Sequence, residues 1–370
     1  SENYWTVMKV AIRTDASTVI GTGHVMRCKT LADELRSRGV GVRFICREHP
    51  GHMIPLLHDA GYSTAVLPAS AAGGYIQDTG RDDYATWLGV EQAVDAAQTI
   101  EALGNFEPDW LVVDHYGLDV TWERLLRPKV GHIFVIDDLA NRHHDCDLLL
   151  NQNLYAEMES HYTEMLPHHA RQLLGPRFAL LRPEFHKARE SLRKRDGTIR
   201  RILVFFGGVD PTRETEKALE ALRQLNRLDI AVDVVIGINN PQADVIHTRC
   251  SEMPNVSFHS QISNMAELME RNDLAIGASG TSTWERCCVS LPTIVVTLAE
   301  NQVDIAKSAA RWGALIYLGQ AQEVSVGALV AALSELMTSS SLVQSLTKKA
   351  GEICDGGGVN RVVNAMLAAS

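Results

Sequence analysis

The chain has 370 residues, of which 45% are hydrophobic and 22% charged, and this balance is typical of a globular enzyme with two domains. The formal net charge of −10 disfavours nucleic acid or an anionic membrane surface as the main partner. No apolar run approaches the ~20 residues of a membrane span, and the seven cysteines lack the spacing of a metal or disulfide framework, so we expect a cytoplasmic protein with free thiols.

Apolar, strand-like runs alternate with helical stretches through the first half of the chain, which predicts a parallel sheet covered by helices. The expected strands cover residues 7–12, 40–46, 64–67, 110–114, 132–136 and 147–150. The expected helices cover residues 26–38, 53–60, 84–103 and 120–126, and the glycine-rich stretch 69–81 is expected to form a surface loop.

Three of these strands end in polar residues, namely Asp114-His115-Tyr116, Asp137-Asp138 and Asn151-Gln152-Asn153. A parallel sheet brings the carboxyl ends of its strands to one edge, so these side chains are expected to meet there beside the loop that follows the first strand. The alternative is that they only cap turns and helices.

The second half repeats the alternation of strands and helices after a charged, helix-like stretch, 187–200, that suits an interdomain connection. Expected strands cover 202–206, 230–236, 256–259, 274–276 and 292–298, and expected helices cover 212–225, 264–269, 283–289, 303–311, 325–338, 342–354 and 359–368. Asp210 and Pro211 are expected as the N-cap and first residue of helix 212–225. The pattern predicts an α/β protein of two Rossmann-like domains, 1–185 and 186–370, facing across a cleft; the last helix could return to the first domain.

The loop after the first strand places a histidine, His24, on the opening turn of a helix directly after Gly21-Thr22-Gly23. At a helix N-terminus the dipole disfavours the imidazolium, so a neutral ring is expected, and a neutral imidazole is what a general base needs. Asp15, at the end of the first strand, is the candidate to hold its tautomer. The alternative is a histidine that hydrogen-bonds only its own loop.

Two glycine turns in the second domain, Gly207-Gly208 and Ser279-Gly280-Thr281, each connect a strand end to a helix. Backbone N–H groups and the positive end of a helix dipole suit a phosphate there, and glycine permits close approach. Glu285, one turn into its helix, could accept hydrogen bonds from a ribose diol. Simple compensation of the helix dipole is the alternative role for this glutamate.

Several common kinds of site are excluded because the chain lacks their sequence motifs. The chain has no P-loop, no third glycine after Gly21-Thr22-Gly23 to complete a dinucleotide fingerprint, and no nucleophile elbow. Its 14 histidines show no zinc-binding spacing. We therefore expect neither a metal nor a cofactor.

The motifs together resemble the PseG family, the UDP-sugar hydrolases of pseudaminic acid biosynthesis. The segments that carry the resemblance are 12–17, 20–27, 114–117 (Asp-His-Tyr-Gly), 148–153, 179–185, 278–285 and 300–302. They cover nearly the whole chain, the region beyond about residue 320 being less diagnostic and the residues before Met8 lying outside the pattern.

The resemblance implies a GT-B fold similar to MurG, with the nucleotide held mainly by the C-terminal domain. The implied reaction converts UDP-2,4-diacetamido-2,4,6-trideoxy-β-L-altropyranose to UDP and free 2,4-diacetamido-2,4,6-trideoxy-L-altrose, a step toward a cell-surface glycan such as that of flagellin. Water activated by His24 would attack the anomeric carbon with inversion and C–O cleavage, without a metal.

The same resemblance implies a role for each remaining candidate. On the sugar side, the implied residues are Gly21, Gly23, Arg27, Asp114, Tyr116 and Asn151. On the UDP side, Gly207, Gly208, Ser279, Gly280 and Thr281 would hold the diphosphate, Ile262 before Met265 the uracil, Glu285 the ribose, and Asn301 and Gln302 the phosphates or sugar.

Two other functions remain open from the sequence. One is a GT-B glycosyltransferase with a UDP-sugar donor, in which His24 deprotonates an acceptor hydroxyl; the stretch 49–55 is only mildly apolar and basic, which argues against a membrane-bound acceptor. The other is a non-catalytic module that binds a UDP-sugar. In each case the partner is a small molecule, no membrane insertion is expected, and the protein is expected to be a monomer or weak dimer.

Overall fold

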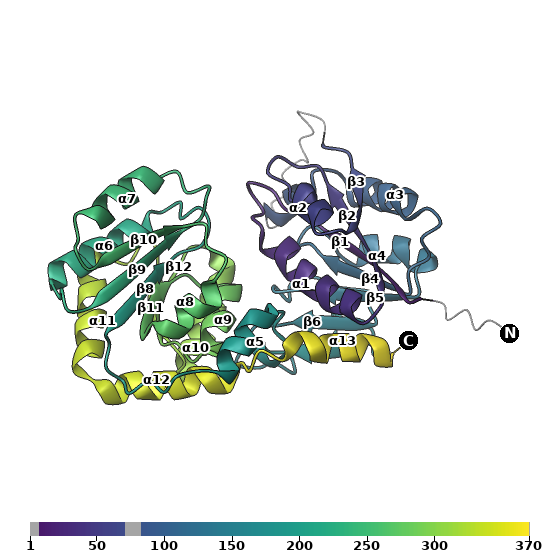
Figure 1. Ribbon diagram of the computed structural model, residues 1–370. Coiled ribbons are helices and arrows are strands. Elements are labelled where there is room, and N and C mark those ends of the chain that lie inside the picture. Colours follow the sequence, from purple (N-terminus) through teal and green to yellow (C-terminus); the bar gives the residue numbers. More distant parts are fainter. Residues whose placement is uncertain (1–6, 71–82, 370) are drawn as a thin grey trace. The chain divides into compact units, whose positions relative to one another are not determined.

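The computed structural model describes residues 7–70 and 83–369, and these residues form two compact units (Figure 1). The first unit holds the chain up to residue 153, residues 157–180, and the segment from 358 onward. The second holds residues 154–156 and 181–357. The boundary therefore falls before the predicted division at 185/186.

Across its described residues, the first unit is built on a seven-stranded parallel sheet in the order β3-β2-β1-β4-β5-β6-β7. The strands are β1 (Lys9–Thr14), β2 (Gly41–Arg47), β3 (Ser63–Leu67), β4 (Trp110–Asp114), β5 (His132–Ile136), β6 (Leu148–Asn151) and β7 (Arg171–Leu174). The central strand β4 is buried along its whole length because helices cover both faces of the sheet, which explains its unbroken apolar sequence. The edge strand β7 was not predicted, since its first two residues are exposed and it offers only a short apolar run.

Helices pack on both faces of this sheet. They are α1 (Gly23–Ser37), α2 (Ile54–Asp59), α3 (Gln92–Leu103), α4 (Val120–Leu126) and, from the far end of the chain, α13 (Gly358–Ala368) (Figure 1). Helix α13 buries Val362 and Met366 in the same core cluster as Leu31 of α1. The predicted helix 84–103 is wrong in its first third: a short 3-10 helix, Asp83–Leu88, precedes Gly89, whose φ of 78° breaks the helix. The predicted loop 69–81 lies outside the described residues from residue 71 onward.

The described part of the second unit contains a six-stranded parallel sheet in the order β10-β9-β8-β11-β12-β13. Its strands are β8 (Arg201–Phe205), β9 (Ala231–Ile236), β10 (Val256–Ser260), β11 (Leu274–Gly277), β12 (Thr293–Thr297) and β13 (Ile316–Gln320). Its helices are α5 (Pro183–Glu190), α6 (Glu214–Leu225), α7 (Ala243–Ser251), α8 (Met265–Arg271), α9 (Thr281–Cys288), α10 (Val303–Trp312), α11 (Val326–Thr338) and α12 (Ser340–Ile353). Strand β13 and helix α7 were not predicted, because β13 is only half-buried and α7 buries just Ile246 and Cys250.

Two predictions about this unit are corrected. The charged stretch 187–200 is helical only to Glu190, where α5 ends, and α5 belongs to this unit because Phe185 is buried beside α8 and α9. Helix α6 begins at Glu214 rather than 212, with Arg213 in a left-handed conformation. Asp210 still caps it, since its carboxylate accepts the backbone N–H groups of Glu214 and Thr215.

Both sheets reverse their strand order at one place, between β1 and β4 in the first and between β8 and β11 in the second. Ligands of open α/β sheets bind outside the carboxyl ends of the strands at such a switch point. A ligand site is therefore expected at the loops that follow β1 and β4 and at those that follow β8 and β11.

None of the described helices alone has the length and apolar character needed to cross a bilayer. One pair, Val326–Thr338 with Ser340–Ala368, meets these criteria only when the two segments are taken together, and the pair is bent by 97°. All seven cysteines are buried free thiols.

Candidate active site

The switch point of the first sheet brings His24 against a buried carboxylate. His24 lies on the first turn of α1, after β1, and Asp114 is the last residue of the neighbouring strand β4. The His24 Nδ1 atom lies 2.6 Å from Asp114 Oδ1. Asp114 is fully buried, whereas the His24 side chain retains 11% exposure. The pair therefore has the form of a base with its orienting carboxylate.

Asp114 is held ionised by its surroundings. Burial raises the pKa of this carboxyl, but the charges of Arg27 and His24 and their hydrogen bonds outweigh burial and bring it well below its ordinary value. Arg27 donates from Nε to Oδ2 at 2.7 Å and from Nη2 to Oδ1 at 2.8 Å. Since an ionised carboxylate only accepts hydrogen bonds, His24 must carry its proton on Nδ1 and present Nε2 as the free lone pair when neutral.

Arg27 connects this pair to a second carboxylate, Asp138, with hydrogen bonds of 2.9 and 2.8 Å. Tyr116 donates to the same carboxylate at 2.6 Å, and Asn153 at 2.8 Å. Burial and the charge of Asp138 raise the pKa of Tyr116 well above its ordinary value, so the phenol stays protonated. Arg27 thus orients the carboxylates behind His24.

An aromatic wall lies beside His24. The Tyr116 ring stands edge-on to the imidazole at 4.5 Å between centroids, and it stacks on Trp87 at 5.4 Å. Tyr84 packs edge-on against both rings. Trp87 and Tyr84 were not among the predicted site residues, because both fall in the stretch 84–103 that was predicted as an ordinary helix.

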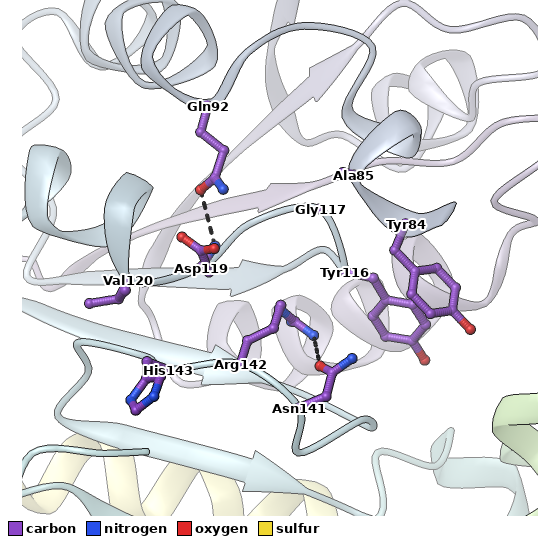
Figure 2. Close-up of a pocket in the computed structure, with 10 residues that line it drawn as sticks. All are labelled: Tyr84, Ala85, Gln92, Tyr116, Gly117, Asp119, Val120, Asn141, Arg142 and His143. Carbon is purple, nitrogen blue, oxygen red and sulfur yellow. Dashed lines mark hydrogen bonds between the residues drawn. The ribbon is translucent and has the colours of Figure 1, made fainter. Parts of the chain in front are cut away.

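A pocket of about 400 Å³ opens on the first unit next to this wall (Figure 2). Its lining residues are Tyr84, Ala85, Gln92, Tyr116, Gly117, Asp119, Val120, Asn141, Arg142 and His143. Figure 2 shows the rings of Tyr84 and Tyr116 at one end, with Arg142 and Asn141 hydrogen-bonded to each other nearby. Tyrosine faces and amide groups are suited to a neutral polar ligand such as a sugar.

The predicted meeting of the polar strand ends is present in the structure, but several members are buried. Asn151 is 1% exposed, and its amide is used by Tyr162 and Asn153. Asp114 and Asn151 are buried and hydrogen-bonded within the protein, so the prediction that their side chains line the sugar pocket is wrong in this structure. Of the three, Tyr116 lines the pocket shown in Figure 2.

The predicted pairing of Asp15 with His24 is also wrong. Asp15 accepts hydrogen bonds from Arg13 (2.6 Å), the backbone N–H of Arg47 (2.7 Å) and the Nε2 of His115 (3.0 Å). Arg13 and Arg47 also bind the buried Asp95. This network joins the ends of β1, β2 and β4, so Asp15 supports the site without touching His24.

The tautomer of His115 follows from its neighbours. Its Nδ1 accepts the backbone N–H of Gly117 at 2.9 Å, so Nε2 carries the proton that is donated to Asp15. Burial lowers the pKa of His115 below its ordinary value despite the nearby Asp15. A neutral His115 therefore fixes the segment that carries both Asp114 and Tyr116.

The glycines of the first unit leave room for a ligand at the loop before α1. Gly21 has a φ of 80°, which glycine adopts readily, and closes a turn through the bond from its N–H to the Ser17 carbonyl. A Cβ added to Gly21 or Gly23 would meet no atom within 4 Å. Both positions thus border open space beside His24.

The second unit presents a similar arrangement at its own switch point. Gly207 and Gly208 follow β8, and Ser279 and Gly280 follow the adjacent β11. A Cβ on Gly207 or Gly208 would also meet nothing within 4 Å, and Gly280 has a φ of 156° at the start of α9. Open space at the Gly207-Gly208 turn, beside a second turn at a helix N-terminus, is suited to an anion.

The other predicted UDP residues lie around these turns or further along the chain. Gln302 accepts the N–H of Leu298, and its Nε2 lies 4.0 Å from the position of a Cβ on Gly280. Glu285 is mostly buried, and its carboxylate lies 3.6 Å from the guanidinium of Arg182. Burial raises the pKa of Glu285. The remaining predicted residues, Asn301, Thr281 and Ile262, are half-buried, and Met265 is buried at the start of α8.

No group of three or more His, Cys, Asp or Glu side chains within residues 7–70 and 83–369 is arranged to hold a metal ion. The carboxylate of Asp114 is hydrogen-bonded to both His24 and Arg27.

Comparison with known proteins follows the two units. Residues 202–354 match the glycosyltransferase family 28 C-terminal domain. The chain is 34% identical over 164 residues to the spore coat polysaccharide biosynthesis protein SpsG of Bacillus subtilis, covering 44% of this chain and 48% of SpsG. It is 26% identical over 274 residues to the UDP-2,4-diacetamido-2,4,6-trideoxy-beta-L-altropyranose hydrolase of Campylobacter jejuni, covering 74% and 85% of the two chains. It spans about half the length of some curated relatives, 57% of one and 48% of SpsG.

Among solved structures, MurG of Acinetobacter baumannii superimposes with a TM-score of 0.68 at 16% sequence identity, over 98% of this chain and 99% of that one. With two parallel-sheet α/β units and the C-terminal domain match, this likeness confirms the predicted GT-B fold.

Proposed function

We propose that this protein hydrolyses a UDP-linked diacetamido-trideoxyhexose, UDP-2,4-diacetamido-2,4,6-trideoxy-β-L-altropyranose, to UDP and the free sugar. The observation that carries the proposal is the 2.6 Å contact between His24 Nδ1 and the buried carboxylate of Asp114. The name of the Campylobacter jejuni relative gives this substrate and its hydrolysis. The resemblance to the PseG family implies that the reaction is a step of pseudaminic acid biosynthesis.

His24 acts as the general base. With its proton held on Nδ1 by Asp114, the Nε2 lone pair takes a proton from water as the water oxygen attacks the anomeric carbon. Asp114 stabilises the imidazolium that forms, while Arg27 keeps that carboxylate ionised and in place. The C–O bond to the diphosphate breaks in the same displacement, so configuration at the anomeric carbon inverts.

The second unit supplies the leaving-group site. The turns at Gly207-Gly208 and Ser279-Gly280 would bind the diphosphate through backbone N–H groups, which stabilise its charge as the C–O bond breaks. Glu285 would bind the ribose, which requires it to exchange its contact with Arg182 for the ribose hydroxyls. In the first unit, the pocket beside Tyr116 offers space for the acetamido-bearing sugar.

A glycosyltransferase is the second candidate, and the family 28 domain match and the MurG-like fold favour it. The same His24–Asp114 pair would then deprotonate an acceptor hydroxyl instead of water. The two activities differ in one requirement: a hydrolase releases UDP in buffer alone, whereas a transferase needs an acceptor alcohol.

Incubation with the UDP-sugar in buffer, with UDP and sugar followed by mass spectrometry, tests the proposal. We expect wild-type protein to release UDP without an acceptor, and His24→Ala to lose about 10²–10⁴-fold of the rate while still binding UDP. His169→Ala, which removes an exposed histidine of the same unit, is the control and keeps the wild-type rate. UDP release by His24→Ala within about tenfold of wild type would remove His24 from the reaction.

A further inference from the structure

Helix α9 carries a buried arginine, Arg286, beneath the loop that leads into the helix. The side chain is 2% exposed and folds back toward the helix N-terminus, as long helical side chains do. Its Nη2 donates to the carbonyl of Ala278 at 2.6 Å, and its Nη1 makes a longer contact of 3.4 Å with Ser282 Oγ. The guanidinium thus lies directly under the Ala278–Gly280 segment.

The loop is shaped around this group. A Cβ added to Gly277 would lie 2.8 Å from Arg286 Nη1, so a glycine here makes room for the guanidinium. The Nε atom is buried, and it has no hydrogen-bond partner within the part of the chain that the structure describes. No carboxylate among the described residues forms an ion pair with Arg286, and the neighbouring Glu285 contacts Arg182 instead. Burial lowers the pKa of Arg286 to about 10, which still leaves it charged at neutral pH.

A second buried arginine in the same unit, Arg195, has a guanidinium that is fully hydrogen-bonded and serves as a comparison. Arg195 is 8% exposed and likewise has no carboxylate partner among the described ion pairs. It instead donates to five main-chain carbonyl oxygens near the C-terminal ends of α8 and α9, with distances from 2.6 to 3.1 Å. Helix C-termini carry partial negative charge, so Arg195 is compensated by the fold itself. Arg286 belongs to the last turn of α9, but its guanidinium reaches back to Ala278 and Ser282 at the N-terminal, positive end of the helix. The helix dipole therefore does not compensate its charge.

We infer that Arg286 is a positioning residue whose charge is balanced by the diphosphate of a bound nucleotide at the Ser279-Gly280 turn. This inference rests on the proposed function for the location of the diphosphate. Burial lowers the pKa of Arg286 and outweighs the charge of Glu285, which favours the cation. A buried cation without an ion-pair partner is costly, and an anion bound at the adjacent turn would add the compensating charge. Arg286 would then raise the affinity of the turn for the diphosphate and contribute nothing to the affinity for the nucleoside.

The inference predicts opposite effects on binding and on stability. Arg286→Gln retains a donor for the Ala278 carbonyl but removes the charge, and Arg286→Lys retains the charge. We expect Arg286→Gln to weaken UDP binding at least about tenfold and to leave uridine binding unchanged, because only UDP carries the diphosphate. Without ligand, Arg286→Gln should melt no lower than wild type, since the protein no longer buries an uncompensated charge.

Calorimetric titration with UDP, with uridine and with inorganic pyrophosphate tests the inference. Arg286→Lys should retain more of the UDP and pyrophosphate affinity than Arg286→Gln. Arg195→Gln is the matched control: it should lower the melting temperature and leave the affinity of the folded protein for UDP unchanged.

The outcomes separate the inference from the proposed function. Equal affinity of wild type and Arg286→Gln for UDP would overturn the inference and leave the proposed function intact. Equal weakening of UDP and uridine binding would also overturn it, because the loss would then be structural. Failure of wild type to bind UDP would overturn both.

Discussion

The contact between His24 and Asp114 makes a sharp prediction for Asp114→Asn. This change preserves shape but replaces a carboxylate, which accepts hydrogen bonds on both oxygens, by an amide with one acceptor and one donor group. His24 and Arg27 now compete for a single oxygen, because both donate to Asp114 in the wild type. His24 is then no longer held in the tautomer that presents Nε2.

The expected loss follows from the bond that is removed. A hydrogen bond to a charged group contributes about 1.5–3 kcal/mol. If that contribution is realised in the transition state, where the imidazolium forms, the rate of UDP release falls about 10- to 160-fold, since 1.36 kcal/mol corresponds to a factor of ten. UDP binding should not change, because Asp114 is buried in the first unit and the proposed diphosphate turns belong to the second.

Single-turnover measurement of UDP release checks this prediction, with thermal melting to confirm folding. Asp138→Asn is the matched control, because it removes the other carboxylate partner of Arg27 and leaves the bond between His24 and Asp114 in place. Both variants should lose stability, and Asp114→Asn should lose much more rate. A folded Asp114→Asn that keeps the wild-type rate, or an equal rate loss in both variants, would refute the role of Asp114 as the partner of His24.

Three further changes are predicted. Gly208→Ala should leave the melting temperature unchanged, because its methyl group would meet no protein atom, but it should weaken UDP binding, because the methyl group would occupy space that the diphosphate needs. Gly327→Ala, in α11, is the control and should bind UDP normally. Burial raises the pKa of Asp95, but the Arg13 charge and hydrogen bonds outweigh it and set the pKa to about 2 against an ordinary 3.8. This lowered pKa contributes about 2 kcal/mol of stability, which is present above about pH 4 and is lost as the pH falls toward 2. In urea unfolding from pH 7 to 3, the free energy of unfolding of wild type should therefore fall with pH. The fall should be smaller in Asp95→Asn. Asp15→Asn should cost about 3–5 kcal/mol of unfolding free energy, because it leaves buried arginine charge uncompensated, while the folded protein retains its rate of UDP release.

The alternation of apolar strands and helices was enough to predict both parallel sheets. Strands such as β4 are buried on both faces and read as unbroken apolar runs, which leaves little doubt about their identity. Two edge strands were missed, Arg171–Leu174 and Ile316–Gln320. Each pairs with one neighbour in its described sheet and is partly exposed, so its sequence carries little apolar signal. Helix 84–103 failed because its apolar positions continue across Gly89, where the backbone turns.

The site was predicted less well than the fold, for a physical reason. Strand order decides which loops meet, and the sequence does not state strand order. Asp15 is near His24 along the chain, but Asp114 is the carboxylate that parallel pairing of β1 with β4 brings to it. Once β1 and β4 are known to be neighbours, the pairing of Thr14 with Asp114 puts the correct residue beside the loop. Arg286 gave no signal at all, since an arginine inside a helix is usually exposed.

Hydrolysis of the UDP-sugar in ¹⁸O-labelled water is the most direct test of the proposed reaction. Attack of water activated by His24 at the anomeric carbon predicts free sugar with one ¹⁸O atom and UDP with none, formed without any acceptor. Label in UDP would mean that a P–O bond breaks, and no UDP release without an acceptor alcohol would mean that the His24–Asp114 pair serves a transferase.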